Sequence, residues 1–217
     1  MFEDNYRHRG LRRRLVKTIS EKGIEDKNVL EAIGKVPRHF FFDSALIEHA
    51  YDDKAFPIGE GQTISQPYTV AFQTALLNIK QGDTVLEIGT GSGYQAAILI
   101  MMGVKLFTIE YNKVLFNKAD VFFKKFNYKV KNFCGDGSQG LKDYAPYDKI
   151  IVTAGCPAVP QPLIEQLNIG GILVIPVGND QTQEMLKITK LSENEIKQES
   201  FLQFSFVPLL GKHGWKK

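Results

Sequence analysis

The sequence predicts an α/β protein with a doubly wound, mostly parallel sheet and an N-terminal helical cap. Short apolar segments alternate with helical segments from residue 83 onward, as in parallel strands joined by crossover helices. The apolar segment at residues 83–88 also runs directly into a glycine-rich turn and then into a helix, an arrangement that leaves free N–H groups facing a ligand. We take residues 79–211 as the ligand-binding core.

Residues 1–78 are expected to form the cap and a substrate loop. The first helix, residues 5–22, has apolar residues at every fourth position on one face and basic residues over the remainder. Such basic runs usually form a solvated helix face, and a nucleic-acid surface is the less favoured interpretation. A second helix should begin after Asp26 and end before Pro37, because Asp caps helices and Pro stops them. A third, short helix is expected between residues 43 and 51.

The segment at residues 55–68 links the cap to the core. It contains two glycines, two prolines and several small polar residues, which predicts an ordered loop rather than a helix or strand. Ordered loops of this kind carry binding groups. A helix over residues 69–77 should follow.

The glycine-rich turn after residues 83–88 is the predicted ligand site. Its three glycines stand at alternate positions, so the backbone can turn tightly and approach a ligand. These residues are Gly89, Gly91 and Gly93. A dinucleotide fingerprint, G-x-G-x-x-G, would require glycine where Tyr94 stands and would not require the acid Glu87. A helix over residues 95–102 should follow the turn.

The second half of the chain continues the alternation. The expected strands are residues 105–109, 129–134, 147–155, 172–176, 185–191 and 201–207, and the expected helices are residues 112–126 and 162–167. A turn at Gly170 and Gly171 and a charged turn over residues 192–199 should separate the last strands. Residues 212–217 are expected to be a loose tail.

Glu110 ends the strand that follows the glycine turn, about 20 residues further along the chain. A carboxylate in this position can accept hydrogen bonds from both hydroxyls of a ribose. The pattern therefore indicates a nucleoside-containing ligand.

Composition excludes several classes of protein. The chain has 217 residues, is 43% hydrophobic and 24% charged, and can bury a proper core. Its net charge of +3 is too small to imply nucleic acid, and its apolar runs are shorter than the ~20 residues that span a bilayer. Cys134 and Cys156 form no C-x-x-C pair, and no signal-peptide pattern is present, so we expect a cytoplasmic protein with reduced thiols. We also expect a monomer. The four histidines lack ligand spacing, and no metal site is expected.

The spacing Glu87-x-Gly89-x-Gly91-x-Gly93 resembles motif I of the class I S-adenosylmethionine-dependent methyltransferases. The resemblance implies a Rossmann-like sheet and a turn that packs against the methionine part of S-adenosylmethionine. It also places the acid near the ammonium group of that cofactor.

A second resemblance is narrower. Residues 62–67 read Gln-Thr-Ile-Ser-Gln-Pro, and this segment, with Arg7 and the step from Val36 to Arg38, is similar to the protein-L-isoaspartate O-methyltransferase family. The likeness covers nearly the whole chain. It implies methyl transfer to the free α-carboxylate of L-isoaspartyl residues in damaged proteins, with S-adenosylhomocysteine as product. The methyl ester would then re-form a succinimide, whose hydrolysis repairs part of the damage.

The resemblance also implies roles for single residues. Ser65 would be the catalytic residue, donating a hydrogen bond that orients the acceptor carboxylate, although the residues alone are equally explained by a helix N-cap. Asp136 would accept from the adenine amino group, with Gly137 beside it; a simple turn is the alternative. The residues implied to bind the cofactor are Gln62, Thr63, Ile64, Ser65, Glu87, Gly89, Gly91, Gly93, Glu110, Asp136 and Gly137. The residues implied to bind the substrate are Pro57, Ile58, Ser65 and Val207.

The chemistry agrees with a carboxylate acceptor. A carboxylate is already ionised at neutral pH, with a reference pKa near ~4, so its methylation needs no general base. The sequence offers no evident base near the predicted site. Two alternatives remain open: a class I methyltransferase that acts on RNA or a small molecule, favoured by the Arg-rich first helix, and a dinucleotide oxidoreductase, with which Glu110 is compatible.

Overall fold

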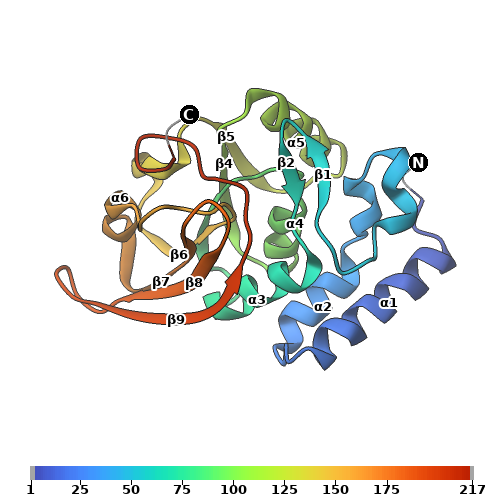
Figure 1. The fold of residues 1–217 in the computed structure, drawn as a ribbon, viewed down its shortest axis with the longest axis horizontal. Coiled ribbons are helices and arrows are strands. Elements are labelled where there is room, and N and C mark those ends of the chain that lie inside the picture. Colours follow the sequence, from blue (N-terminus) through green and yellow to red (C-terminus); the bar gives the residue numbers. More distant parts are fainter. Residues whose placement is uncertain (1–2, 216–217) are drawn as a thin grey trace.

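A seven-stranded sheet forms the centre of the molecule in a computed structural model that describes residues 3–215 (Figure 1). The strands are β3 (Thr84–Ile88), β4 (Lys105–Glu110), β5 (Val130–Cys134), β6 (Tyr147–Val152), β7 (Leu167–Gly178), β8 (Gln183–Lys190) and β9 (Ile196–Phe204). Their order is β5-β4-β3-β6-β7-β8-β9, and all neighbours are parallel except in the β7-β8 and β8-β9 pairs. The predicted doubly wound, mostly parallel sheet is confirmed.

Helices surround the sheet. They are α1 (Tyr6–Glu21), α2 (Lys27–Lys35), α3 (Pro67–Leu77), α4 (Tyr94–Met101), α5 (Lys113–Lys125) and α6 (Gln161–Glu165). Of these, α3, α4, α5 and α6 contact the strands of the sheet directly. Three of the six helices begin where an Asn or Asp side chain accepts backbone N–H groups of the first turn, at Asn5, Asp26 and Asn112. Within residues 3–215, every helix is too short or too polar to cross a membrane.

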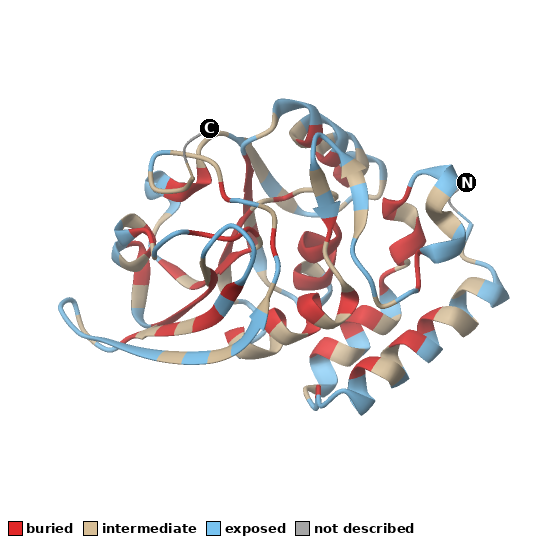
Figure 2. Cartoon of the chain, in the orientation of Figure 1, coloured by how far each residue is buried: buried red, intermediate tan, exposed pale blue. Residues whose placement is uncertain are grey.

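The N-terminal helices pack through their apolar faces, as predicted. Leu15 and Ile19 of α1 and Ile33 of α2 join one buried cluster that also includes residues of α3 and α4. Figure 2 shows buried stretches along these helices, which pack against one another and against α3 and α4. The predicted third helix is a 3-10 segment, Ser44–His49, and a further, unpredicted 3-10 segment, Arg38–Phe41, precedes it. Because cap and core share this cluster, the division at residue 78 stays a prediction.

Residues 55–68 differ from the prediction of a loop without strands. They contain an antiparallel hairpin formed by β1 (Phe56–Gly59) and β2 (Gln62–Ile64). Gly59, Glu60 and Gly61 all have positive φ angles, of 90°, 54° and 67°, which closes a tight turn. The strands span only four and three residues, and the first contains Pro57 and Gly59, so they are too short to show a strand pattern in the sequence.

The bounds of the C-terminal strands differ from those predicted from the sequence. Gly170 and Gly171 do not form a separate turn but lie inside the long strand β7, next to an irregularity in its pairing with β6. Strand β9 begins at Ile196, within the predicted charged turn, and Lys197, Gln198 and Glu199 pair with β8 at the edge of the sheet.

The predicted loose tail is wrong for residues 212–215. The backbone N–H of Lys212 donates to the Asp136 carboxylate (2.8 Å), and the Trp215 indole donates to the Gly155 carbonyl (3.0 Å). Residues 216 and 217 lie outside the described part of the chain. The C-terminal segment is therefore part of the folded core.

Candidate functional site

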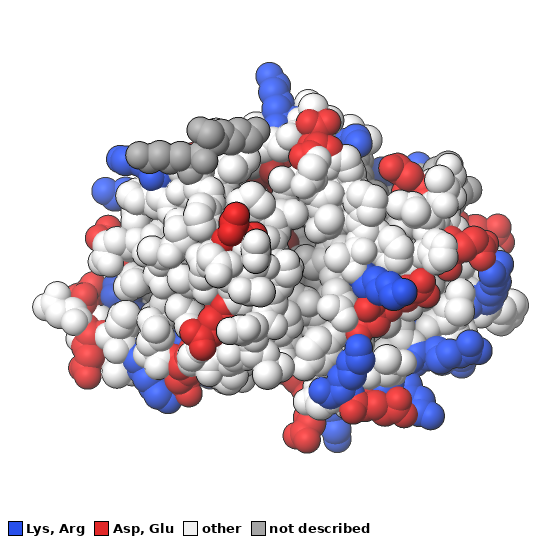
Figure 3. All heavy atoms as spheres, in the orientation of Figure 1, with Lys and Arg blue, Asp and Glu red and all other residues white. Residues whose placement is uncertain are grey.

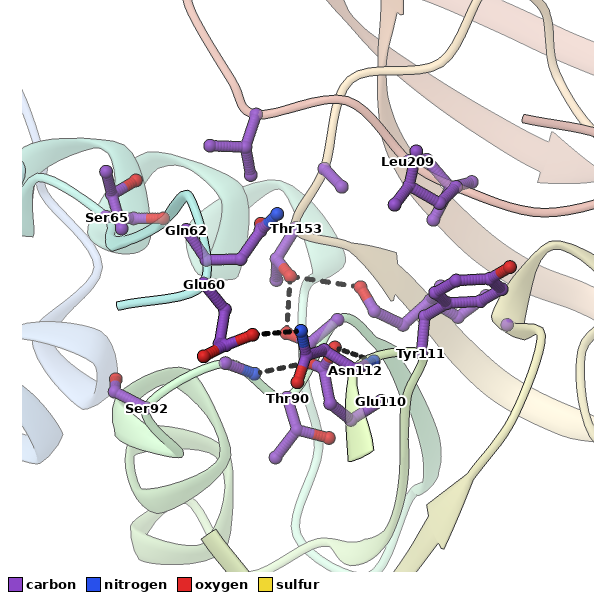
Figure 4. A pocket seen from close by; sticks show the side chains of 18 of the residues that line it. Glu60, Gln62, Ser65, Thr90, Ser92, Glu110, Tyr111, Asn112, Thr153 and Leu209 are labelled. Carbon is purple, nitrogen blue, oxygen red and sulfur yellow. Dashed lines mark hydrogen bonds between the residues drawn. The ribbon is translucent and has the colours of Figure 1, made fainter. Parts of the chain in front are cut away.

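A cavity of about 720 Å³ opens at the carboxyl ends of the central parallel strands (Figure 4). This is the edge where doubly wound sheets bind ligands, beside the strand from which crossovers run in both directions. Figure 4 shows Ser65 and Gln62 on one side of the cavity and Tyr111 and Leu209 on the other. The predicted residues that line it are Gln62, Thr63, Ile64, Ser65, Gly89, Gly91, Glu110, Gly137 and Val207.

The glycine turn gives the cavity its floor. A Cβ on Gly89 would lie 2.5 Å from the Thr153 hydroxyl oxygen, and one on Gly93 would lie 2.9 Å from the Phe123 ring. These two glycines, with φ angles of 96° and 85°, are required by packing inside the protein. Gly93 does not line the cavity. Gly91 does, and its backbone faces the open space.

Glu110 is held rigidly at the end of β4. One carboxylate oxygen accepts from the Gly91 N–H and the other from the Asn112 N–H, each at 2.8 Å. The side chain is 7% exposed and faces the cavity. A carboxylate has about four lone-pair sites, so about two remain for hydroxyl groups of a ligand. The arrangement fits a ribose.

Glu87 lies beneath the turn, is fully buried and does not line the cavity. It accepts a 2.6 Å hydrogen bond from Thr108, whose hydroxyl lies 2.7 Å from that of Thr90. Its other oxygen has no hydrogen-bond partner among residues 3–215. Burial raises the pKa of Glu87 to about 8, against the opposing effect of Thr108. A chain of hydrogen bonds through the Thr108 and Thr90 hydroxyls therefore connects the Glu87 carboxyl group to the cavity wall, which Thr90 lines.

Asp136 is hydrogen-bonded within the protein and does not line the cavity. Its carboxylate accepts from the Ser138 N–H and hydroxyl, from the Gln139 amide and from the Lys212 N–H, at 2.6–3.1 Å. Burial pushes the pKa of Asp136 upward, but these hydrogen bonds outweigh it and hold the pKa below its ordinary value. Gly137, next in the chain, lines the cavity together with Ile109. A role of Asp136 in adenine recognition stays a prediction.

Ser65 lies on the cavity wall after β2. Its carbonyl accepts from Arg38 at 2.9 Å, while its hydroxyl makes no hydrogen bond with another residue of the described chain. The N-cap interpretation is wrong, because α3 begins at Pro67 and its N-cap residue is Gln66. The backbone N–H of Tyr68 is capped instead by Asp53, at 2.8 Å. The Ser65 hydroxyl is thus free for a ligand.

Pro57 and Ile58 lie apart from the other predicted substrate residues. They line a neighbouring cavity of about 450 Å³ beneath the β1-β2 hairpin, whereas Ser65 and Val207 line the main cavity. Their predicted contact with the substrate backbone stays a prediction.

Several cavity residues were not predicted. They are Glu60, Thr90, Tyr111, Asn112, Thr153, Leu209 and Trp215, among others. Asn112 donates from its side chain to Glu60 at 3.2 Å, so the tip of the hairpin is joined to the end of β4. Tyr111 and Asn112 directly follow Glu110, and this proximity was the one available signal in the sequence. Trp215 depends on the return of the C-terminal segment, for which no local pattern exists.

Two of the four histidines, His8 and His39, lie side by side in the structure although they are far apart in the sequence. His8 and His39 stack with ring centroids 3.8 Å apart, and Asp4 lies within ligand distance of both. These groups already have protein partners: Asp4 pairs with Arg12 at 2.9 Å, and a His39 ring nitrogen lies 2.7 Å from the Tyr51 hydroxyl. Burial lowers the pKa of His39. The cluster ties the N-terminal segment to the cap.

Comparisons with known proteins agree with this geometry. The sequence model of the family described as Protein-L-isoaspartate(D-aspartate) O-methyltransferase (PCMT) matches residues 11–214. A protein-L-isoaspartate O-methyltransferase of Cytophaga hutchinsonii is 61% identical over 213 residues, covering 98% of this chain and 96% of its own. One of Christiangramia forsetii is 55% identical over 209 residues, covering 96% and 98%.

Two solved structures share the fold. One, a protein-L-isoaspartate O-methyltransferase, superposes with a TM-score of 0.83 at 27% identity, covering 93% of this chain and 66% of its own. The other, a PCMT from Plasmodium falciparum in complex with S-adenosyl-L-homocysteine, has a TM-score of 0.80 at 25% identity, covering 92% and 98%. The family predicted from the sequence is confirmed, and this chain belongs to the protein-L-isoaspartate (D-aspartate) O-methyltransferase family.

Proposed function

We propose that this chain transfers a methyl group from S-adenosylmethionine to the free α-carboxylate of L-isoaspartyl residues in damaged proteins and peptides. The observation that carries the proposal is the juxtaposition of Ser65 and Glu110 in one cavity, in a chain of this family. Glu110 can hold a nucleoside, and Ser65 offers a free hydroxyl to an acceptor. The cytoplasmic location and monomeric state expected from the sequence stay predictions.

The cavity residues fit S-adenosylmethionine. The remaining lone pairs of Glu110 can accept the ribose hydroxyls, and Gly91 exposes backbone to the part of the ligand above the turn. Ile88 and Ile109 supply an apolar surface for a flat base beside Gly137. When bound, S-adenosylmethionine supplies a methyl group on a positively charged sulfur. Gln62, Thr63 and Ile64 would enclose it from the side of the hairpin.

The protein's part in the reaction is positioning. The acceptor carboxylate needs no general base, because its reference pKa is near ~4. Ser65 would donate its hydroxyl hydrogen to one carboxylate oxygen and so hold the other in line with the methyl group. Such alignment can contribute up to ~7 to 11 kcal/mol in favourable systems. Ser65 would not act as a nucleophile, since no base lies within hydrogen-bond distance of it among the described residues.

The basic residues of α1 give less support to an RNA acceptor than the sequence indicated. Arg7 pairs with Glu48, and Arg9 and Arg12 pair with Asp4, so these charges are engaged within the protein. Arg12 is also buried.

The test is transfer of labelled methyl from S-adenosylmethionine to matched peptides with L-isoaspartate or L-aspartate at one site. We expect label on the isoaspartyl peptide alone, and loss of that label in mild base, as for a carboxyl methyl ester. No label on either peptide, with S-adenosylhomocysteine still bound, would overturn the proposed acceptor and retain the cofactor.

A further inference from the structure

A second cavity of about 410 Å³ adjoins the first on the side of the acceptor. Both cavities are lined by Thr63, Ser65, Thr153 and Val207, so these four residues form their common wall. The rest of the second cavity comes from Ala55, from Gln66 and the start of α3, and from the end of β9 with the segment that follows it. A substrate held at Ser65 would therefore lie at the mouth of this space.

The second cavity has no charged lining residue among those described. Leu202, Phe204 and Phe206 provide apolar surface, and Tyr68 adds an aromatic ring. The other lining residues are neutral and mostly polar: Ala55, Thr63, Ser65, Gln66, Thr69, Thr153, Gln203, Ser205 and Val207. Figure 3 shows the face of the molecule on which β9 lies. Uncharged residues cover most of its left and central parts. The space is thus suited to a neutral side chain with apolar surface.

Two charged residues beside Tyr68, Asp53 and Lys22, are paired with each other. Asp53 accepts from the Tyr68 N–H at 2.8 Å and pairs with Lys22 at 2.5 Å. The Lys22 ammonium lies 5.6 Å from the centre of the Tyr68 ring. Neither residue lines the cavity. A charged side chain placed there would find no ionic partner on its walls.

We propose that this cavity receives the side chain of a residue flanking the isoaspartyl residue, and that it selects apolar and aromatic side chains over charged ones. The inference rests on the proposed function, because it places the isoaspartyl carboxylate at Ser65. Neighbouring residues of an extended peptide are ~3.3 Å apart along the chain, so a side chain next to the isoaspartyl residue reaches the shared wall.

The physical reason is desolvation. A Phe or Leu side chain gains contact with the three apolar residues, whereas Lys or Glu would lose hydration without a compensating charge. Pockets of this kind discriminate by about tenfold or more between side chains that do and do not fill them. The discrimination should fall on kcat/KM for the peptide.

The first experiment uses two series of isoaspartyl peptides, with Phe, Leu, Lys or Glu directly before the isoaspartyl residue in one and directly after it in the other. We expect Phe and Leu to exceed Lys and Glu by about tenfold in kcat/KM in one of the two series. Equal rates throughout both series would overturn the subsite and leave the proposed function intact. No methylation of any peptide would instead overturn the proposed function.

The second experiment changes the charge of the cavity rim. Leu202 is 55% exposed and lines the cavity, so Leu202→Glu and Leu202→Lys should fold. We expect Leu202→Glu to raise the relative rate of the Lys peptide several-fold and Leu202→Lys to do so for the Glu peptide. Ile196→Glu and Ile196→Lys are the matched controls, since Ile196 is 42% exposed on the same strand but does not line the cavity. The subsite is supported if the two Leu202 variants prefer oppositely charged peptides while the two Ile196 variants keep the parent's preference. It is overturned if the Leu202 and Ile196 variants show the same peptide preferences.

Discussion

Thr108 donates a 2.6 Å hydrogen bond to the buried carboxyl group of Glu87, whose other oxygen has no partner in the described chain. This single hydrogen bond does not offset the desolvation of a carboxylate. The pKa of Glu87 accordingly rises from its ordinary 4.5 to about 8. Near neutral pH the group is largely protonated in the folded protein and ionised in the unfolded chain.

This difference makes stability depend on pH. Between pH 4.5 and 8 the folded state binds the additional proton, so the free energy of unfolding falls as pH rises, by about 1.4 kcal/mol per pH unit from this group. Glu87→Gln removes the titration. We expect the stability of Glu87→Gln relative to the parent protein to increase steadily from pH 5 to pH 8, as measured by urea unfolding.

Glu25→Gln is the control for this series, because Glu25 is exposed and its substitution should leave the pH profile unchanged. Parallel profiles for Glu87→Gln and the parent protein would contradict the raised pKa.

Glu110 is expected to decide cofactor affinity. In Glu110→Gln one carboxylate oxygen becomes an NH₂ group, which would face the N–H of Gly91 or of Asn112 with a donor where an acceptor is needed. Loss of charged hydrogen bonds and of the ribose acceptor should weaken S-adenosylhomocysteine binding by about tenfold or more. Isothermal titration calorimetry measures this directly. Glu184→Gln, on the exposed face of β8, should bind as the parent does; equal affinity of both variants would remove Glu110 from the site.

The sequence predicted the parallel core well because its signals are local. Residues 83–88 form a buried apolar run that ends at glycines, and the structure has β3 at Thr84–Ile88 and a turn in which Gly89 and Gly93 have positive φ. Asp26 and Pro37 likewise delimit α2 through capping and the conformational restriction of proline. Helix caps, glycines and prolines act on the backbone within a few residues of their own position, so a single sequence shows their effect.

The features that were missed depend on contacts between distant segments. The side chains of the hairpin β1-β2 do alternate in burial, but its strands span only four and three residues, too few to distinguish a strand from a loop in the sequence. Asp136 stands in the predicted turn, but its partner Lys212 is 76 residues away and returns with the C-terminal segment. The contribution of Trp215 to the cavity follows from the same return. No periodicity in a single sequence encodes such pairings.

Ser65→Ala should separate catalysis from cofactor binding. The Ser65 hydroxyl has no protein partner among the described residues, so its removal leaves no buried group unsatisfied and the fold should be unaffected. We expect kcat/KM for the isoaspartyl peptide to fall by about tenfold or more, through loss of one hydrogen bond to a charged group. The dissociation constant of S-adenosylhomocysteine should change less than about twofold.

Ser200→Ala, on the exposed edge strand β9, controls for the loss of a hydroxyl elsewhere. A Ser65→Ala enzyme with the parent's kcat/KM would show that another group orients the acceptor.

Gly89→Ala and Gly10→Ala should have opposite effects. At Gly89 the added methyl group would lie 2.5 Å from the Thr153 hydroxyl oxygen, at a φ angle of 96° that alanine rarely adopts. The strain and the clash should destabilise the protein by about 1–3 kcal/mol and weaken S-adenosylhomocysteine binding, since the turn is the floor of the cavity. At Gly10, within α1, no atom lies within 4 Å of the added methyl group, and alanine favours the helix.

Thermal and urea unfolding should therefore find Gly10→Ala more stable than the parent by about 0.5–1 kcal/mol. Its cofactor affinity and activity should be unchanged, because α1 does not line the cavity. A Gly89→Ala protein with full stability and affinity would mean that the turn can move away from Thr153. In that case the glycine would be needed neither for packing nor for the ligand, and the strained φ angle would carry no functional meaning.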